Sequence, residues 1–315
     1  KILDTDDIEL VAINSGSAAD SHAYLLKYDS LYGKCNADIK VDGNDLVVNG
    51  KKTAVYQIRD PKDINWKKHN VDIVVESTGK FTEMQDVKKH LDAGAKRVLV
   101  TAPCKDPNIP NIVMGVNDED VDLDKYKVVS NASCTTNCLA PVMKVLNKEF
   151  KVERSFVNTV HAFTYTQNLL DNSNPEDFRR ARATTESIIP TTTGAMKALG
   201  LVIPELEGKV DGMAFRVPVP TVSCIYVVAK LEKEVSAKDL NKMFKKYEEH
   251  ELSGILGTSD EPLVSVDFRG DSRSAIVDLM STKVLPGGYV RVVAWYDNEW
   301  GYICRVLDLI RWFSA

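Results

Sequence analysis

Short apolar runs alternate with segments of helical periodicity in the first half of the chain. Strands are predicted at the apolar runs, residues 8–13, 71–75, 97–101, 112–116 and 128–129. Helices are predicted at 19–28, with Leu25 and Leu26 facing inward, and from a capping-box pattern at 82–85 to near Gly94. A hairpin is predicted at 38–48. Strands that are apolar throughout and are separated by helices indicate a parallel sheet covered on both faces.

Longer β-rich runs dominate the second half of the chain. Strands are predicted at 155–163, 209–217, 221–231, 263–268, 275–279 and 290–296. Helices are predicted at 194–202 and 237–249, and helical periodicity returns at 299–313. This arrangement favours a mostly antiparallel sheet with helices on one face. The predicted fold class is therefore α/β, with a parallel-sheet domain followed by an α+β domain.

Length and composition limit the class of protein. A chain of 315 residues is long enough for two domains. The net charge of −5 gives no broad positive surface for nucleic acid. No apolar run reaches the roughly 18 residues of a membrane span, and no signal peptide opens the sequence. The 6 cysteines are scattered and do not resemble a disulfide framework, so we expect a cytoplasmic protein.

The stretch SNASCTTNCLAP, residues 130–141, places Cys134 where a short strand ends and a helix begins. The free N–H groups and the dipole of a helix start favour an anion, so we expect the Cys134 thiol to lose its proton readily and to act as a nucleophile. The hydroxyl residues on either side of it suit a second anion. The alternative is a buried structural cysteine. Cys134 and Cys138 have a spacing that suits a metal, but no second Cys/His pair completes a site, so we expect no metal.

A reactive thiol gains from a neighbouring base, usually a histidine. Of the 5 histidines, His161 alone is predicted to lie in an apolar strand beside hydroxyl and aromatic residues. A lone histidine in a strand is often structural. With a candidate nucleophile in the same chain, however, we predict that Cys134 and His161 form a pair that moves a proton.

Arginine and threonine residues supply two candidate anion sites. Arg179, Arg180 and Arg182 follow a polar stretch, and Arg216 ends a predicted strand. Planar guanidinium groups suit bidentate phosphate binding, although the arginine run is equally consistent with a solvated surface. Residues 191–194, TTTG, offer hydroxyl groups and a helix N-terminus to a second anion.

The segments SNASCTTNCLAP, the strand that contains His161, RRAR, IIPTTTGAMKA, GMAFRVP and WYDNEWGY occur in this order, and together they resemble phosphorylating glyceraldehyde-3-phosphate dehydrogenase. The resemblance extends from about Ile8 to the C-terminus. It implies a Rossmann-type dinucleotide-binding domain at 1–133 and 298–315 and a catalytic domain at 134–297. The family is typically a homotetramer, and nothing in the resemblance implies nucleic acid or a membrane as a partner.

The resemblance also implies a reaction. Cys134 would attack the aldehyde of D-glyceraldehyde 3-phosphate to form a thiohemiacetal, with His161 as the base. Hydride transfer to the cofactor would leave a thioester, which inorganic phosphate would release as 1,3-bisphosphoglycerate. The residues implied for the attacking phosphate are Ser133, Thr135, Thr193 and Gly194, and those for the substrate's own phosphate are Thr164, Arg180 and Arg216. The residues implied for the cofactor are Asn14, Ser15, Ser77, Thr78, Gly79, Thr101, Ser173, Asn298 and Tyr302. Among these, Asn298 would hold the nicotinamide carboxamide, with Tyr302 close by.

The sequence departs from the family pattern before Ile8, where no Gly-x-Gly-x-x-Gly loop occurs. That loop normally receives the cofactor pyrophosphate. We interpret the difference as a shortened sequence. The alternative is a natural chain that does not bind the cofactor in the usual way.

A second departure concerns the choice of cofactor. Ser15 follows Asn14 where NAD-specific members have an aspartate, whose carboxylate would accept from the ribose hydroxyls and repel a 2′-phosphate. Ser173 replaces a proline that is frequent in NAD-preferring relatives, in a loop that reaches the adenosine end of a neighbouring subunit's cofactor. Both residues indicate NADP, alone or alongside NAD. Neutral change in an NAD enzyme is the alternative.

Two other functions stay open. Erythrose-4-phosphate dehydrogenase shares the cysteine and the histidine but releases a free acid, and the surroundings of Thr135 and Arg180 favour the triose phosphate. The other is a non-catalytic binding protein, and the complete set of expected catalytic residues weighs against it.

Overall fold

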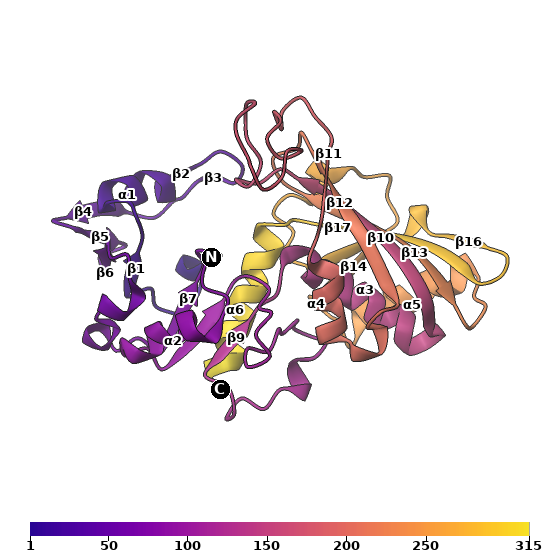
Figure 1. The fold of residues 1–315 in the computed structure, drawn as a ribbon, viewed down its shortest axis with the longest axis horizontal. Coiled ribbons are helices and arrows are strands. Elements are labelled where there is room, and N and C mark those ends of the chain that lie inside the picture. The colour runs from indigo at the N-terminus through magenta and orange to yellow at the C-terminus, as the bar shows by residue number, and fades with distance from the viewer. Residues whose placement is uncertain (315) are drawn as a thin grey trace. The chain divides into compact units, whose positions relative to one another are not determined.

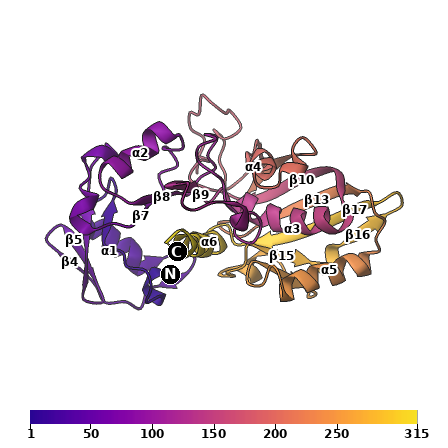
Figure 2. The same cartoon turned by 90° about the horizontal axis from the view of Figure 1, so that it is seen from below.

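The computed structural model describes residues 1–314, which form two compact units (Figure 1, Figure 2). Unit 1 consists of Lys1–Pro110, Leu123–Ser130 and the chain from Ile310 onward. Unit 2 consists of Asn111–Asp122 and Asn131–Leu309. Within the described residues, no helix combines the length and the apolar character needed to cross a membrane.

Unit 1 contains two small sheets. The first is parallel and has the order β7 (Ile73–Glu76), β8 (Arg97–Val100), β9 (Val128–Ser130). The second has the order β1 (Ala12–Asn14), β6 (Lys51–Tyr56), β5 (Asp45–Val48), β4 (Ile39–Asp42), with β1 and β6 parallel. Unit 1 also contains α1 (Ala19–Lys27), α2 (Met84–Asp92), the short ribbon of β2 (Tyr28–Asp29) and β3 (Gly33–Lys34), and three short 3₁₀-helices. The predicted parallel sheet is confirmed, and so is the hairpin, whose strands β4 and β5 pair antiparallel.

Unit 2 is built on one large mixed sheet. Its order is β11 (Ile189–Thr191), β12 (Val210–Val217), β10 (Val152–Ala162), β13 (Ser223–Leu231), β17 (Tyr289–Tyr296), β15 (Ala275–Asp278), β14 (Leu256–Ser259), and β16 (Lys283–Leu285) pairs with β17. Most neighbouring strands are antiparallel, as predicted, whereas β10–β12 and β14–β15 are parallel.

Helices α3 (Cys134–Phe150) and α5 (Ala237–Glu249) lie against the sheet of unit 2 (Figure 2). The other helices with residues in this unit are α4 (Ala195–Val202) and α6 (Trp300–Ser314). Apolar side chains of α3, such as Leu139 and Met143, are fully buried in one core with alternate residues of β13 and β17. This burial fixes α3 on the sheet, and with it the position of its first residue, Cys134.

Two predicted strands are wrong. Residues 112–116 form turns because side chains at 117 and 118 bind the backbone: Asn117 Oδ1 accepts from Val113 N (2.8 Å), and Asp118 Oδ1 accepts from Gly115 N (2.6 Å). Ser265–Phe268 is a 3₁₀-helix, because the Asp267 carboxylate accepts the N–H of Val264 at its start. In addition, β1 is shorter than the predicted 8–13 and is displaced by a residue toward the C-terminus.

Two predicted features of the helices are wrong as well. Leu25 and Leu26 are 66% and 38% exposed, because α1 turns Ala19 toward the buried residues of β5 instead. Helix α2 begins at Met84 without a capping box: its first N–H group donates to Asp106 Oδ2 (2.8 Å). A carboxylate distant in sequence thus replaces the expected local cap.

Candidate active site

The start of α3 is fixed by its own side chains. Ser133 caps the helix, since its Oγ accepts from Thr136 N at 3.1 Å. Asn137 Nδ2 donates to the carbonyl groups of Asn131 (2.8 Å) and Ser133 (3.0 Å). The preceding Ala132 has a φ of +51°, a left-handed conformation that costs free energy in a residue other than glycine. The turn is therefore held by hydrogen bonds that present Cys134 as the first residue of the helix.

Cys134 lies beside His161, as the sequence predicted. The distance between Cys134 Sγ and His161 Nε2 is 3.5 Å. His161 is the second-last residue of β10 and is 4% exposed. The pair therefore joins a helix start to the end of a central strand, and a proton can pass between the two groups.

Arg216 is the third member of this group. Strands β10 and β12 are parallel, and their register places His161 opposite Arg216. Arg216 Nη1 lies 2.6 Å from His161 Nδ1 and 3.1 Å from Ala162 O, while His161 Nδ1 lies 2.7 Å from Ala162 O. An arginine can only donate, so these contacts do not all fit one tautomer. A base role for Nε2 requires Nδ1–H to donate to Ala162 O, with Arg216 directed at the same carbonyl.

Burial controls the protonation of both reacting groups. It raises the pKa of the Cys134 thiol, and the Arg216 charge and hydrogen bonds involving Thr135 oppose this rise only in part. The expectation that the helix start alone makes this thiol acidic is therefore wrong. Burial also lowers the pKa of His161 to about 3, and repulsion by Arg216 adds to the effect. At neutral pH the pair is a thiol and a neutral imidazole, so His161 can accept a proton.

The surroundings of Arg216 suit an anion. Its buried Nε has no hydrogen-bond partner within residues 1–314. Burial lowers the pKa of Arg216, Cys134 opposes this, and the charge of Arg180 lowers the pKa further, so the two arginines are electrostatically coupled. Arg180 Nε forms an ion pair with Asp177 at 3.1 Å. An anion between two coupled guanidinium groups would relieve their repulsion and satisfy the free donor.

Tyr296, the last residue of β17, was not predicted as part of the site. Its hydroxyl lies 2.9 Å from Thr135 Oγ1 and 3.0 Å from Thr159 Oγ1, and its ring packs edge-on against His161. Burial raises the pKa of Tyr296 well above its ordinary value. The alternation of buried residues along β17 points Tyr296 inward, and this pattern in the sequence could have revealed it.

Replacement of Tyr296 by phenylalanine is expected to destabilise unit 2. Two buried threonine hydroxyls lose their partner, which lowers the free energy of unfolding by about 1–3 kcal/mol. The urea midpoint of unfolding measures this change. Tyr226→Phe is the matched control, because Tyr226 is 38% exposed on β13 and its hydroxyl has no intramolecular bond described. An equal shift for both variants would contradict the bridging role of Tyr296.

The other residues expected in the catalytic half bind local groups. Thr164 Oγ1 contacts Thr166 Oγ1 (2.9 Å), and Thr193 Oγ1 accepts from Ala195 N (3.2 Å) at the start of α4. Gly194 is exposed, with open space where a Cβ would stand. Ser173 N donates to Asn172 Oδ1 (2.8 Å) in an exposed loop. Within the described chain, no hydrogen bond joins these residues to Cys134 or His161.

Asn298 and Tyr302 are held near the same group. Asn298 Oδ1 accepts from Ser223 Oγ (2.9 Å), which itself accepts from Ala162 N (3.0 Å). Val222, next to this serine, has a φ of +67°, a conformation rare for a β-branched residue and frequent at functional sites. Tyr302 OH donates to Ala132 O (3.1 Å), in the turn before Cys134.

The remaining residues expected to bind the cofactor belong to unit 1. Asn14 ends β1, and Ser15 follows it. Ser77, Thr78 and Gly79 follow β7, and Thr101 follows the adjacent parallel strand β8. The carboxyl ends of parallel strands are where ligands bind in open α/β sheets. These residues fit one half of a dinucleotide site.

A buried network holds the turn after β7 and was missed by sequence reasoning. Glu76 Oε1 accepts from Thr78 N (2.7 Å) and Oγ1 (2.5 Å), and Glu76 Oε2 lies 3.0 Å from His90 Nε2. Trp66 Nε1 donates to His90 Nδ1 (3.1 Å), so the proton of the neutral ring lies on Nε2. Burial raises the pKa of Glu76, but the hydrogen bonds from His90 and Thr78 outweigh it, so the pKa lies below its ordinary value.

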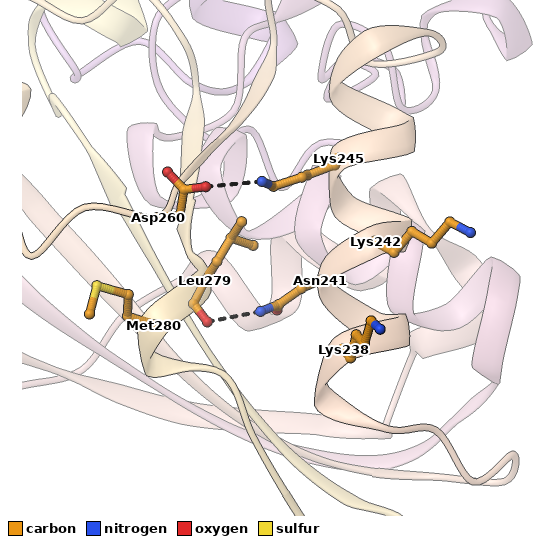
Figure 3. A pocket seen from close by; sticks show the side chains of 7 residues that line it. All are labelled: Lys238, Asn241, Lys242, Lys245, Asp260, Leu279 and Met280. Carbon is orange, nitrogen blue, oxygen red and sulfur yellow. Dashed lines mark hydrogen bonds and ion pairs between the residues drawn. The ribbon is translucent and has the colours of Figure 1, made fainter.

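A hollow of about 470 Å³ on α5 holds none of the expected residues (Figure 3). In it, Lys245 pairs with Asp260 (3.1 Å), and Asn241 donates to Leu279 O (2.9 Å). No three His, Cys, Asp or Glu side chains among residues 1–314 form a group able to hold a metal ion. The candidate catalytic pair, Cys134 and His161, is therefore not part of this hollow.

Comparisons with known proteins agree with the geometry of the site. Residues 133–298 match the family described as "Glyceraldehyde 3-phosphate dehydrogenase, C-terminal domain", and residues 1–84 match the "NAD binding domain" of the same enzyme. Glyceraldehyde-3-phosphate dehydrogenases from Priestia megaterium and Geobacillus stearothermophilus are each 52% identical over 313 residues, which cover 99% of this chain and 93% of the relative. A second such enzyme of Synechocystis is 48% identical, over 96% of this chain and 89% of its own length. The chain therefore belongs to the glyceraldehyde-3-phosphate dehydrogenase family.

Proposed function

We propose that this protein catalyses the reversible oxidative phosphorylation of D-glyceraldehyde 3-phosphate to 1,3-bisphosphoglycerate, with NADP, alone or alongside NAD, as the hydride acceptor. One observation carries the proposal: a thiol at a helix start lies 3.5 Å from a neutral imidazole, with a guanidinium beside the imidazole. Family membership supports the same reaction.

The reaction begins with covalent addition to Cys134. Its sulfur bonds to the aldehyde carbon, and the thiol proton passes through His161 Nε2 to the carbonyl oxygen, which gives a thiohemiacetal. When bound, the nicotinamide ring supplies a hydride acceptor. As the C–H hydride leaves the substrate, His161 takes the hydroxyl proton, and a thioester on Cys134 results. An oxygen of inorganic phosphate then attacks the thioester carbonyl. The C–S bond breaks, and the thiolate recovers its proton from His161.

Two donors stabilise the oxygen on which negative charge develops. The backbone N–H of Cys134 belongs to the first turn of α3, where N–H groups have no partner inside the helix. The Nε2 of His161 is the second donor while it carries a proton. Donors that are fixed before the reaction stabilise this charge without reorganisation.

Two groups of residues would hold the phosphates. Arg180, Arg216 and Thr164 would bind the substrate's phosphate, which is supported by the unpartnered Nε of Arg216. Ser133, Thr135, Thr193 and Gly194 would bind the attacking phosphate. The single Tyr296 proton, if donated to Thr135, leaves the proton of that threonine free for phosphate.

For the cofactor, we propose one group of residues in each unit. Asn14, Ser15, Ser77, Thr78, Gly79 and Thr101 would bind its adenosine and ribose portions, and Asn298 and Tyr302 would bind the nicotinamide. Ser223 Oγ donates to Asn298 Oδ1, so the Asn298 Nδ2 group is left as a donor for the nicotinamide carboxamide. Ser15 lacks the carboxylate that would repel a 2′-phosphate, and this supports NADP. Ser173 would act on a neighbouring subunit's cofactor.

The organisation of the chain is part of the proposal. We propose that residues 1–133 and 298–315 form the dinucleotide-binding domain and 134–297 the catalytic domain. The compact units differ from this division, since 111–122, 131–133 and 298–309 belong to unit 2. We further propose a homotetramer in the cytoplasm. Neither nucleic acid nor a membrane is a proposed partner.

A kinetic experiment tests this function. The full chain is mixed with D-glyceraldehyde 3-phosphate and either NADP or NAD, with and without inorganic phosphate. We expect reduction of the cofactor that depends on phosphate, a product trapped by hydroxylamine as an acyl phosphate, and a higher kcat/KM for NADP. Turnover without phosphate that releases a free acid would instead favour the erythrose-4-phosphate type. Failure to bind either cofactor would favour a non-catalytic protein.

A further inference from the structure

A histidine lies against the residue that is proposed to determine the cofactor preference. β1 ends at Asn14, Ser15 follows, and α1 begins at Ala19 (Figure 1). Ser15 Oγ lies 2.8 Å from Nε2 of His22, in the first turns of α1, and also accepts the N–H of Ser17 at 2.9 Å. His22 is thus one hydrogen bond away from the atom that stands where NAD-specific relatives place a carboxylate.

The turn that carries Ser15 is held in place. Asn14 Nδ2 donates to Ile58 O (3.0 Å), and Asn14 Oδ1 accepts from Ile58 N (2.9 Å). Ser15 N donates to Tyr56 O (3.0 Å), and the side chain of Gln57 donates to Gly16 O (3.1 Å). Apart from Ser15, Gly16 and Ser17 themselves, no atom of residues 1–314 lies within 4 Å of where a Cβ on Gly16 would stand. The result is a fixed polar corner with open space beside it, which favours binding of a ligand group.

The donors of this corner match a phosphate monoester. A ribose diol needs an acceptor, and a carboxylate supplies one, whereas a 2′-phosphate needs donors. Ser15 offers one hydroxyl proton. A histidine offers an N–H group in its neutral form and two in its cationic form, and the cation is stabilised by an adjacent dianion. The one acidic residue of α1, Asp20, is exposed and accepts from Ser21 N (2.8 Å).

We propose that His22 is a specificity-determining residue that, together with Ser15, binds the 2′-phosphate of NADP. This inference rests on the proposed cofactor preference and adds the residue that makes the phosphate favourable and not merely tolerated. Ser15 by itself removes a repulsion, while His22 adds an attraction.

Binding of nucleotide fragments tests the proposal without any turnover. Calorimetry on the full chain compares adenosine 2′,5′-bisphosphate with adenosine 5′-monophosphate, which differ only in the 2′-phosphate. The wild-type protein is expected to bind the bisphosphate more tightly. His22→Leu loses a hydrogen bond to a charged group. It is therefore expected to raise the Kd for the bisphosphate by about tenfold or more and to leave the Kd for the monophosphate unchanged. His22→Gln keeps a donor without the charge, so its loss should be smaller but measurable.

Two further variants sharpen the result. His69→Leu is the matched control, because His69 is also a half-buried histidine of unit 1 with one hydrogen bond to a hydroxyl, that of Tyr56 (2.6 Å). It should bind both nucleotides like the wild type. Ser15→Asp should abolish the preference for the bisphosphate, because the new carboxylate repels the phosphate and pairs with His22. His22→Leu in that background should then cause little further loss of bisphosphate binding.

The outcomes separate the two proposals. If the wild type binds both nucleotides equally, the NADP preference and the role of His22 both fail. If the wild type prefers the bisphosphate but His22→Gln or a folded His22→Leu keeps that preference undiminished, the role of His22 alone fails. If His22→Leu does not fold, His22→Gln decides. The proposed reaction at Cys134 is unaffected by any of these results.

Discussion

Replacement of Cys134 by serine is expected to lower kcat on the order of 10⁴-fold or more, because the reaction loses its covalent nucleophile. The serine hydroxyl is far less acidic than a thiol, and a neutral His161 in a buried strand is too weak a base to ionise it. An ester would also transfer its acyl group to phosphate less readily than a thioester does. Steady-state turnover at saturating substrate measures the loss, and binding of the nicotinamide cofactor by calorimetry should be unchanged.

Cys138 supplies the control for this experiment. It lies one turn further along α3, is fully buried, and burial raises the pKa of its thiol well above the ordinary value. Cys138→Ala should therefore keep kcat, although the small cavity lowers stability slightly. A comparable loss of kcat in both variants would mean that α3, and not the Cys134 sulfur, is the sensitive feature. Substantial turnover by Cys134→Ser would contradict covalent catalysis.

The parts of this site that could be predicted are those that residues close together in the sequence determine. The stretch around Cys134 contains its own cap, Ser133, and its own apolar face, so its strand-to-helix geometry follows from local pattern. His161 could be chosen because only 5 histidines were available and it alone lies in a predicted apolar strand. Both inferences needed only short-range information.

The parts that could not be predicted depend on long-range register. Arg216 reaches His161 because β10 and β12 are parallel and aligned at those two residues, which no local motif encodes. The pKa of the Cys134 thiol depends on how deeply the assembled unit buries it, and this burial outweighs the helix start. The cap of α2 likewise comes from Asp106, 22 residues after Met84. Secondary-structure propensity and hydrophobic periodicity carry no information about such contacts between residues that are distant in sequence.

The errors in the fold have the same origin. Residues 112–116 and 263–268 have the apolar character of strands, but carboxylate and amide side chains nearby bind the backbone N–H groups and form turns instead. Leu25 and Leu26 look like an inward face only if α1 packs through its leucines, whereas the sheet contacts Ala19. Tertiary contacts determine whether side chains or a neighbouring strand bind these N–H groups, and they determine which face of a helix is buried.

Arg216→Gln is expected to lower kcat/KM by about 10²-fold or more, since this side chain is proposed to bind the substrate phosphate and its charge also acts on the Cys134 thiol. Its charge lowers the pKa of Cys134, so removing it raises that pKa and decreases the thiolate fraction at any pH below it. The rate at which iodoacetamide alkylates Cys134, followed by peptide mapping, should therefore fall at fixed pH. The pH dependence of alkylation should move to higher pH.

Two arginine variants separate these two roles of Arg216. Arg216→Lys keeps the charge but not the bidentate geometry, so alkylation should stay near the wild-type rate while KM for glyceraldehyde 3-phosphate rises. Arg180→Gln should also raise KM but should slow alkylation much less than Arg216→Gln, because Arg216 and not Arg180 is the main charge that lowers the pKa of Cys134. If Arg216→Gln alkylates as fast as the wild type, then Arg216 acts only as a phosphate ligand. In that case the reactivity of the thiol must come from His161 and the start of α3 alone.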